Sequence, residues 1–550
     1  MSVVAPGPAQ LAGGPRRSKA PALLRTGGLA LAFVFAFPGI YLTYRAFGQG
    51  SDPASLLFSE RTLAPLGRTL TLAAAVSAGS LVLGTGLAWL THRTDLPGRR
   101  VWRVVLPLPL VYPTFLGAAA FIRTLNPGGL ANDLLVGLGV DSTPELRGFF
   151  GAWVVLLLMC YPYVYLPVAM RLTQLPPSVE ASARLLGDNA LTAFWRVALP
   201  HAATAIGAGT LLVFLYTLSD FGAVQLMRYD TLTRAIATKH LADPPAALAL
   251  SLMLLALAAV VVTAERWISK RLPDGSGIGG LQPTTLSLGR WRPLATVAVA
   301  AAGFAGVGAP LLALLDWAGG GIARTLTDAR PLAVDYPRIF EVTFSTLWVS
   351  VIAAVVAVAA VLPIAFLVGR YRSRTGWLAH AVIISTFALP GLLIALSMRF
   401  WTLRSDVAFS LFGDTFALLI FAYVVRFGSL AMGVSVVAVR SVPDRLHDSA
   451  RLLGAGPVRR LVTIDLPLMG PALVAGAGLV LLSVMKELPI SLLISPLGFS
   501  TLATQIFGSF EDAFIAEAGL MGVVLVAVSF VLTWFLVVRR QEQLTASQRE

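Results

Sequence analysis

The sequence is poor in charged residues. Only 13% of its 550 residues are Asp, Glu, Lys or Arg, against roughly 25% in an ordinary soluble domain, while 56% are apolar. The apolar residues form runs of about 20, the length that a helix needs to cross roughly 30 Å of hydrocarbon. A membrane-spanning barrel would instead show strands of about 10 residues with alternating polarity. The composition therefore predicts an all-α polytopic membrane protein.

The sequence also lacks the residue groupings of an enzyme. Its single cysteine, Cys160, lies within an apolar run, which excludes an intrachain disulfide or a cysteine-based metal cluster and predicts a packing role. The five histidines are scattered, and no nucleophile, base and orienting residue can be grouped. No Gly-x-x-x-x-Gly-Lys-Ser/Thr phosphate loop occurs. We therefore expect no catalytic residue and no cofactor in this chain, and the pattern assigns no metal ligands.

Twelve membrane-spanning helices are predicted from the apolar runs. The expected ranges are 27–46, 69–91, 103–122, 149–170, 202–227, 246–264, 294–316, 343–368, 377–401, 415–438, 471–494 and 518–538. Lys and Arg concentrate in alternate loops, as the positive-inside rule predicts, so both termini are expected on the cytoplasmic side. This placement explains the formal net charge of +14 without nucleic acid as a partner. The first apolar run is too long for a signal peptide and is interpreted as a retained helix.

An internal repeat divides these spans into six and six. The sequence ARLLG occurs at 183–187 and again at 450–454. Upstream, Thr69 and Pro113 match Thr346 and Pro390 with one common spacing, slightly longer than that of the ARLLG pair, which indicates one insertion. Because each half has an even number of spans, the two copies must run parallel.

The polar, Gly- and Pro-containing stretch at 265–293 is the natural linker between the halves. The predicted divisions are a cytoplasmic tail at 1–26, a first six-helix domain at 27–264, the cytoplasmic linker at 265–293, a second six-helix domain at 294–538 and a cytoplasmic tail at 539–550.

A patterned loop recurs between the fourth and fifth span of each half. In the first copy the residues before Gly187 have helical composition, and Gly187 can end that turn in a left-handed conformation. A second short helical stretch then leads to Pro200 at the foot of the next span. The pattern predicts a helix-turn-helix segment attached to a membrane-spanning helix.

These paired segments resemble the signature of type I binding-protein-dependent ABC importer permeases. That signature is a cytoplasmic Glu-Ala-Ala, three residues, a Gly, and a Leu-Pro about a dozen residues later. The resemblance covers nearly the whole chain, but the second copy has Asp448-Ser449-Ala450, and the first has Ala181-Ser182-Ala183 with Glu180 one residue upstream. It implies coupling of these segments to an ATPase. In the first copy the implied residues are Glu180, Ser182, Ala183, Arg184, Gly187, Leu199 and Pro200. In the second copy they are Asp448, Ser449, Ala450, Arg451, Gly454, Leu466 and Pro467.

The resemblance also implies the partners and the location. ATP is expected on separate ABC ATPase subunits, as a homodimer, because this chain has no phosphate loop of its own. A periplasmic or lipid-anchored binding protein would deliver the solute, and the chain would lie in the bacterial cytoplasmic (inner) membrane as a multi-pass protein. Beyond these proteins and the lipid bilayer we expect no further partner, and no nucleic acid.

Four ionisable residues fall inside the predicted spans. Asp220 and Glu487 are related by the same spacing as the two ARLLG copies, and Arg426 and Lys486 lie in the second half. A charge within the bilayer costs about 2.5 to 3.5 kcal/mol on insertion scales and usually faces a polar interior. Lys486 and Glu487 would point about 100° apart on a helix and so need other partners. Two interpretations remain open: residues beside the translocation path, or ion pairs that lock helices together.

The substrate is suggested by three short stretches. The residues 485–490 (MKELPI) and 501–506 (TLATQI), with the first-half counterpart 231–236 (TLTRAI), resemble the ferric-iron branch of fused ABC permeases. Fused thiamine permeases are similar, so thiamine or another small solute stays an alternative. No grouping of Tyr, His and carboxylate ligands can be assembled from spacing alone.

Two other classes compete with an ABC permease. A major facilitator carrier also has parallel six-helix halves, and the loop Asp95–Arg100 resembles its signature, but a solvated turn explains that loop equally well. The paired Gly-to-Leu-Pro segments have no role in such a carrier. A channel or membrane enzyme would show rings of charge or clustered polar residues, and the sequence has neither.

Overall fold

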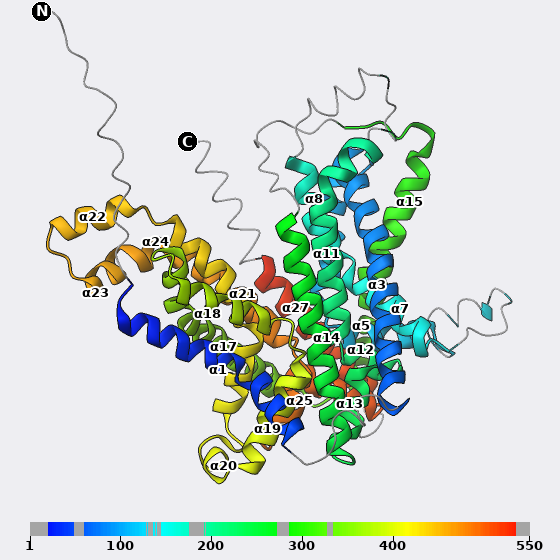
Figure 1. Ribbon diagram of the computed structural model, residues 1–550. Helices are drawn as coiled ribbons and strands as arrows, with labels where there is room; N and C mark the ends of the chain where they lie inside the picture. Colours follow the sequence, from blue (N-terminus) through cyan, green and yellow to red (C-terminus); the bar gives the residue numbers. More distant parts are fainter. Residues whose placement is uncertain are drawn as a thin grey trace, which may run out of the picture.

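The protein is described by a computed structural model. It describes residues 20–48, 60–127, 129, 132, 136–137, 139, 145–174, 187, 192, 194–271, 285–326 and 334–534. Within these residues the secondary structure is helical, apart from one isolated bridge between Thr94 and Leu286. The helices form a polytopic bundle of two repeated halves, as the sequence predicts (Figure 1).

The helices of the first half follow one another as α1 (Ala22–Phe47), α3 (Glu60–Arg93), α4 (Arg99–Val105), η1 (Leu108–Val111), α5 (Thr114–Leu125), α7 (Gly148–Cys160), α8 (Pro162–Gln174), η2 (Phe194–Ala198), α11 (Leu199–Ser219), α12 (Gly222–Leu226), α13 (Leu232–Lys239) and α14 (Pro244–Arg271). The predicted first domain ends at 264, so α14 continues into the expected linker.

The helices of the second half are η3 (Gly289–Trp291), α15 (Arg292–Gly303), η4 (Phe304–Gly308), α16 (Ala309–Leu326), α17 (Tyr336–Gly369), α18 (Arg374–Thr386), α19 (Gly391–Arg404), α20 (Asp406–Phe412), α21 (Phe416–Ser441), α22 (Asp444–Leu452), α23 (Pro457–Arg460), η5 (Leu461–Asp465), α24 (Leu466–Met485), α25 (Pro489–Ile494), α26 (Leu502–Glu511) and α27 (Ile515–Thr533).

Two of the twelve spans are broken, contrary to the prediction of continuous helices at 103–122 and 377–401. The chain bends by 101° between η1 and α5 and by 102° between α18 and α19. Pro113 and Pro390 stand immediately before α5 and α19 in extended conformations. Proline has no amide hydrogen and its ring clashes with the preceding turn, so each helix stops before it and restarts after it. The other ten spans are single helices long and apolar enough to cross a membrane.

The fifth and eleventh spans also end earlier than predicted. α11 ends at Ser219 and α24 at Met485, and the short helices α12 and α25 follow after a break. Lys486 and Glu487 therefore lie in a break between helices rather than along one helix, which corrects the expected geometry. Irregular backbone at membrane depth is tolerated only where it is buried in protein or lines a cavity. The breaks thus mark a candidate site.

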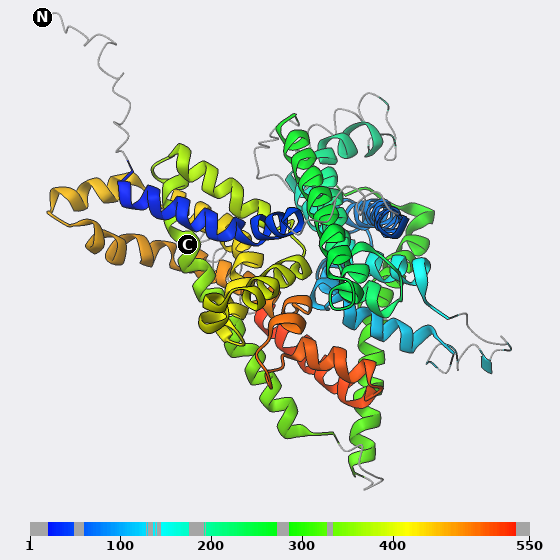
Figure 2. The same ribbon diagram turned by 60° about the horizontal axis from the view of Figure 1, so that its bottom comes forward.

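The first span of each half packs against the other half (Figures 1 and 2). The α1 helix lies along α17, α18 and α19, and the Tyr41 hydroxyl donates to the Phe400 carbonyl at 3.2 Å. The α16 helix packs between α5 and α27, and the Tyr112 hydroxyl of the first half donates to the Val307 carbonyl at 3.3 Å. The linker therefore separates the two halves in the sequence, whereas in the folded protein the first span of each half packs against the other half.

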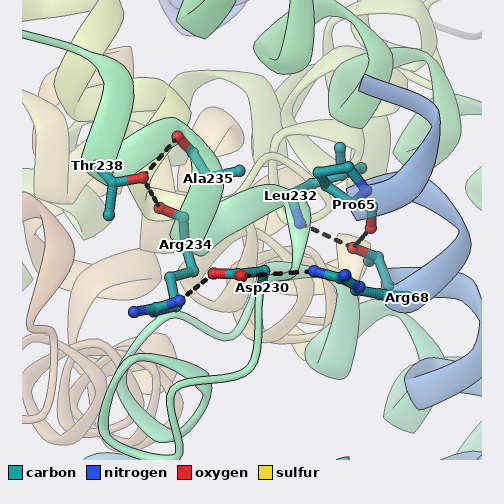
Figure 3. A network of polar contacts seen from close by, with 8 residues as sticks. Pro65, Arg68, Asp230, Leu232, Arg234, Ala235 and Thr238 are labelled. Atoms are coloured by element: carbon teal, nitrogen blue, oxygen red, sulfur yellow. Dashed lines mark hydrogen bonds and ion pairs between the residues drawn. The ribbon is translucent and has the colours of Figure 1, made fainter. Parts of the chain in front are cut away.

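The repeat is visible in equivalent hydrogen bonds as well as in the helix order. Thr69 of α3 accepts from the Leu232 amide at 2.8 Å and donates to the Pro65 carbonyl, in the network of Figure 3. Thr346 of α17 accepts from the Leu502 amide at 2.7 Å. The threonines whose recurrence indicates the duplication thus connect the long second span of each half to a later helix of the same half. That helix is α13 in the first half and α26 in the second, and each begins at the leucine of a Thr-Leu pair.

The end of the linker docks onto the loop after α3. The Leu286 amide donates to the Arg93 carbonyl at 2.8 Å, and the Asp95 carboxylate accepts from the Leu288 amide at 2.9 Å. The Asp95 side chain therefore holds the linker, while Pro97 and Gly98 of the same loop form an exposed turn.

Candidate translocation site and coupling segments

The four predicted intramembrane charges line one cavity. Asp220, Arg426, Lys486 and Glu487 surround a hollow of about 160 Å³ at the level of the helix breaks. Three tyrosines of the first half, Tyr112, Tyr163 and Tyr216, contribute to its wall. Equivalent positions of the two halves face each other here, since Asp220 and Glu487 follow the equivalent helices α11 and α24. The cavity therefore lies where the two repeats meet.

The two cations cap the broken spans. Lys486 Nζ donates to the Leu110 carbonyl at 2.9 Å, and Arg426 Nη1 donates to the Phe387 carbonyl at 2.8 Å and also to the Leu389 carbonyl. Leu110 and Phe387 are equivalent residues of the repeat, at the end of the first part of each broken span. A helix end leaves carbonyl groups without partners, and positive charge is favourable there. Each break is thus stabilised by a cation from a non-equivalent position.

The two carboxylates differ in their hydrogen bonds. Asp220 Oδ2 accepts from the Thr114 hydroxyl at 2.5 Å, and Oδ1 accepts from the Ala223 and Val224 amides at 3.0 and 3.3 Å. The Glu487 carboxylate interacts with the Ile490 amide, but its Oε1 atom is buried and accepts no hydrogen bond from the described residues. Asp220 caps the N-terminus of α12, whereas Glu487, which lines the same cavity, has one buried oxygen without a donor among the described residues.

The alternative of ion pairs that lock helices is not what these four residues show. Among the described residues, no nitrogen and carboxylate oxygen of Asp220, Arg426, Lys486 and Glu487 lie within 4.0 Å of each other. Backbone carbonyls accept from Lys486 Nζ and Arg426 Nη1, whereas Arg426 Nε is buried without a partner among the described residues, and the Arg426 charge acts on Glu487 at longer range. Backbone amides and Thr114 donate to Asp220. The polar residues of the cavity therefore support the helix breaks first.

The second coupling segment is a helix-turn-helix, as the sequence predicts. The α22 helix ends at Leu452. Gly454 follows with a left-handed φ of +74°, and the Ala455 amide closes the turn on the Ala450 carbonyl at 2.9 Å. The segment continues through α23 and the π-helical turn η5 into α24, which begins at Leu466. Figure 1 shows α22 and α23 projecting from the bundle. Their tip exposes Leu452 and Leu453 at 89% and 85%.

A buried polar cluster, unforeseen in the sequence, holds α22 to the base of α24. His447 Nε2 lies 3.0 Å from Asp465 Oδ1, and Arg370 Nη1 lies 3.4 Å from the same carboxylate. His447 and Asp465 are almost fully buried. Burial, and next to it the guanidinium of Arg370, lower the pKa of His447 below its usual 6.5, so the neutral imidazole donates from Nε2. His447 is the one buried residue of α22. A histidine among the polar residues of this segment is the signal in the sequence that indicates the cluster.

Less of the first coupling segment can be placed. Gly187 has a φ of +95°, the left-handed conformation that the sequence predicts, and Leu199 and Pro200 open α11. Phe194–Ala198, directly before them, form the π-helical turn η2, which is continuous with α11, and Thr192 is helical. Most of the predicted second short helical stretch lies outside the described residues. Glu180, Ser182, Ala183 and Arg184 lie outside the described residues.

A larger hollow of about 950 Å³ lies at the opposite end of the molecule. The ends of α5 and α16 and the start of α27 form it, and its wall includes Arg123, Arg147, Asp316 and Glu517. The helices α11 and α24 begin at the coupling segments and run toward this end. The larger hollow thus has charged walls and is formed by other residues than the small central cavity.

Comparison with known proteins gives a consistent result. The family described as "binding-protein-dependent transport system inner membrane component" matches residues 80–273 and 361–543. An Fe(3+)-transport system permease of Haemophilus influenzae, FbpB 2, is 28% identical over 92% of this chain and 96% of its own length. A probable molybdenum ABC transporter permease of Haloferax volcanii is 27% identical over 35% of this chain and 71% of its own. The sulfate transport permease CysW of Synechocystis is 27% identical over 36% and 71%.

Proposed function

Because the chain belongs to the family of inner membrane components of binding-protein-dependent transport systems, and is therefore the permease of an ABC importer, we propose that its solute is ferric ion. The relative that matches it over almost its full length is a ferric-ion permease, while the sulfate and molybdenum relatives match little more than a third. Those two families also supply the competing solutes, so the central cavity has to discriminate between them.

The size and walls of the cavity carry the proposal. A volume of about 160 Å³ lies below the roughly 300 Å³ at which drug-sized ligand sites begin. A partly hydrated metal ion fits this space, whereas thiamine does not. The Glu487 carboxylate and the tyrosines provide the oxygen ligands that hard cations prefer.

An oxyanion fits the cavity less well. Lys486 Nζ and Arg426 Nη1 donate to backbone carbonyls of the broken spans, so sulfate or molybdate would compete with these carbonyls for the same nitrogens. Two carboxylates share the same small space and would repel an anion. The polar groups therefore favour a cation over the solutes of the sulfate and molybdenum permeases.

We assign the coupling segments to the cytoplasmic side, with both termini there, because the arginines of α22 and α23 lie at this end. Exposed Leu452, Leu453 and Val458 form an apolar tip that fits a groove on an ATPase subunit. Two such segments call for two ATPase subunits, as a homodimer that binds ATP, with no cofactor in this chain. The charged outer hollow is then where the periplasmic or lipid-anchored binding protein docks.

Reconstitution of the permease in proteoliposomes with its ATPase subunit and binding protein tests the solute. We expect ferric-loaded binding protein to stimulate ATP hydrolysis and to drive uptake of radioactive iron. Binding proteins loaded with thiamine, sulfate or molybdate serve as comparisons. Stimulation by one of these and not by ferric ion would overturn the substrate while leaving the importer in place.

The docking surface is tested separately. Leu452→Asp combined with Leu453→Asp should abolish co-purification of the ATPase subunit, because two charges replace the apolar tip. Leu497, 90% exposed beyond α25 at the other end of α24, provides the matched control. Leu497→Asp should leave ATPase binding intact, and equal loss in both variants would contradict the assignment of α22 and α23.

A further inference from the structure

The surroundings of the two equivalent carboxylates of the cavity differ at the residue that follows each span-breaking proline. Thr114 is the first residue of α5, Gly391 is the first residue of α19, and each follows the proline that breaks its span. The Thr114 hydroxyl donates to Asp220. Gly391 has no side chain with which to do the same for Glu487.

Gly391 also makes room for the glutamate. A Cβ atom built at residue 391 would overlap Glu487 Oε1, so the carboxylate occupies the space that a side chain would take. Oε1 is buried and accepts no hydrogen bond from the described part of the chain. Such an atom costs about 1 to 3 kcal/mol when it is left without a partner, so its retention needs an explanation.

The surroundings decide what partner this oxygen can take. Lys486 and Arg426 direct donors to the carbonyls of Leu110 and Phe387. The rings of Tyr163 and Tyr216, whose centroids are 5.3 Å apart, line the same cavity. A carboxylate with an unpartnered oxygen, in a small cavity that is also lined by tyrosines, matches a hard metal cation with part of its hydration shell.

We propose that Glu487 is the carboxylate of the permease that contacts the transported cation, through Oε1, and that Asp220 is a structural cap for α12. The assignment rests on the proposed function, because it names the residue that a hard trivalent cation would meet. The two positive side chains in the same cavity weaken cation binding, and a transport site must hold its ion weakly enough to release it.

Two variants, each of which removes one negative charge, distinguish the role of Glu487 from that of Asp220. Glu487→Gln should lower binding-protein-dependent iron uptake about 10-fold or more, because a charged contact to the ion is lost. Asp220→Asn should lower the thermal unfolding temperature of the purified permease, while iron uptake per folded molecule falls less than threefold. Glu487→Asp keeps the charge and covers the case in which the Gln variant fails to fold; it should retain more uptake than Gln.

Direct metal binding provides a readout that a structural role would not change. Terbium ion is a hard trivalent probe whose luminescence is sensitised by nearby tyrosine, so the full-length permease should show a sensitised site through Tyr163 and Tyr216. This signal should disappear in Glu487→Gln and persist in Asp220→Asn. Loss of the signal in Asp220→Asn alone, or unchanged iron uptake in Glu487→Gln, would overturn the assignment. Failure of ferric ion to stimulate the unmodified assembly would instead overturn the proposed function.

Discussion

Removal of the Asp465 carboxylate should release the second coupling helix from the bundle. In Asp465→Ala, His447 Nε2 loses an acceptor at 3.0 Å in an almost fully buried site, and Arg370 loses a contact at 3.4 Å that is partly exposed. A hydrogen bond to a charged group contributes about 1.5 to 3 kcal/mol, and the longer, more exposed contact contributes less. We therefore expect the docked state of α22 to lose about 3 kcal/mol.

Amide hydrogen exchange measures this loss locally. A change of about 3 kcal/mol corresponds to roughly a hundredfold faster exchange of the α22 amides, because about 1.4 kcal/mol is a factor of ten. Peptides from α21, in the core of the second half, should exchange as in the unmodified protein and serve as an internal reference. Asp465→Asn keeps one acceptor oxygen and should show an intermediate effect.

The matched control lies on the same helix. Asp448 pairs with Arg451 at 3.5 Å, but both side chains are more than half exposed, and such surface pairs contribute about 0 to 1 kcal/mol. Asp448→Asn should therefore change α22 exchange little. Unchanged α22 exchange in a folded Asp465→Ala protein, or equal acceleration in the control, would refute the role of the buried cluster.

Three further outcomes follow from the packing and the polar contacts. Docking of α22 should weaken as the pH falls through about 6.5, measured by exchange at matched intrinsic rates: His447 in the undocked helix has the ordinary pKa of 6.5, the docked form has a lower one, and protons therefore favour undocking. Gly519→Ala should destabilise the protein by about 1 to 3 kcal/mol in thermal unfolding, because the new Cβ overlaps Trp317, whereas Gly27→Ala meets open space and should not. Thr346→Val should cost about 1 to 3 kcal/mol by the same assay, because the first amide of α26 loses its buried acceptor.

The sequence predicted the number of spans and their pairing well, because both depend on length and on repeated residues. Runs of about 20 apolar residues indicate where the membrane-spanning helices lie. The constant spacing of the repeated motifs predicts the parallel repeat. It failed at the breaks. Pro113 and Pro390 serve as repeat markers in the sequence, although the same residues stop the third and ninth spans. Average hydropathy does not distinguish a continuous span from two parts that meet at 101°.

The sequence indicated which residues line the candidate site, but not the hydrogen bonds that these residues form. These residues were chosen because a charged side chain within the bilayer has a high free-energy cost. All four line one cavity: Asp220, Arg426, Lys486 and Glu487. Lys486 and Arg426 bind carbonyl groups that lack helical partners only because the spans are broken. The spacing of residues in the sequence therefore could not predict these hydrogen bonds. The same limit applies to His447 and Asp465, which lie on different helical segments and meet only through the fold of the coupling segment.

Fusion of the two halves into one chain explains why the cavity is asymmetric. A permease built from two identical subunits would carry every charge twice, on both sides of the axis. Here Arg426 and Lys486 occupy positions that are Met159 and Ser219 in the first half, and Gly391 replaces the threonine that satisfies Asp220. The cavity consequently has two cations and two carboxylates, whereas two copies of the second half would bring twice as many cations. This leaves a formal charge of zero for these four side chains and one buried carboxylate oxygen without a donor among the described residues.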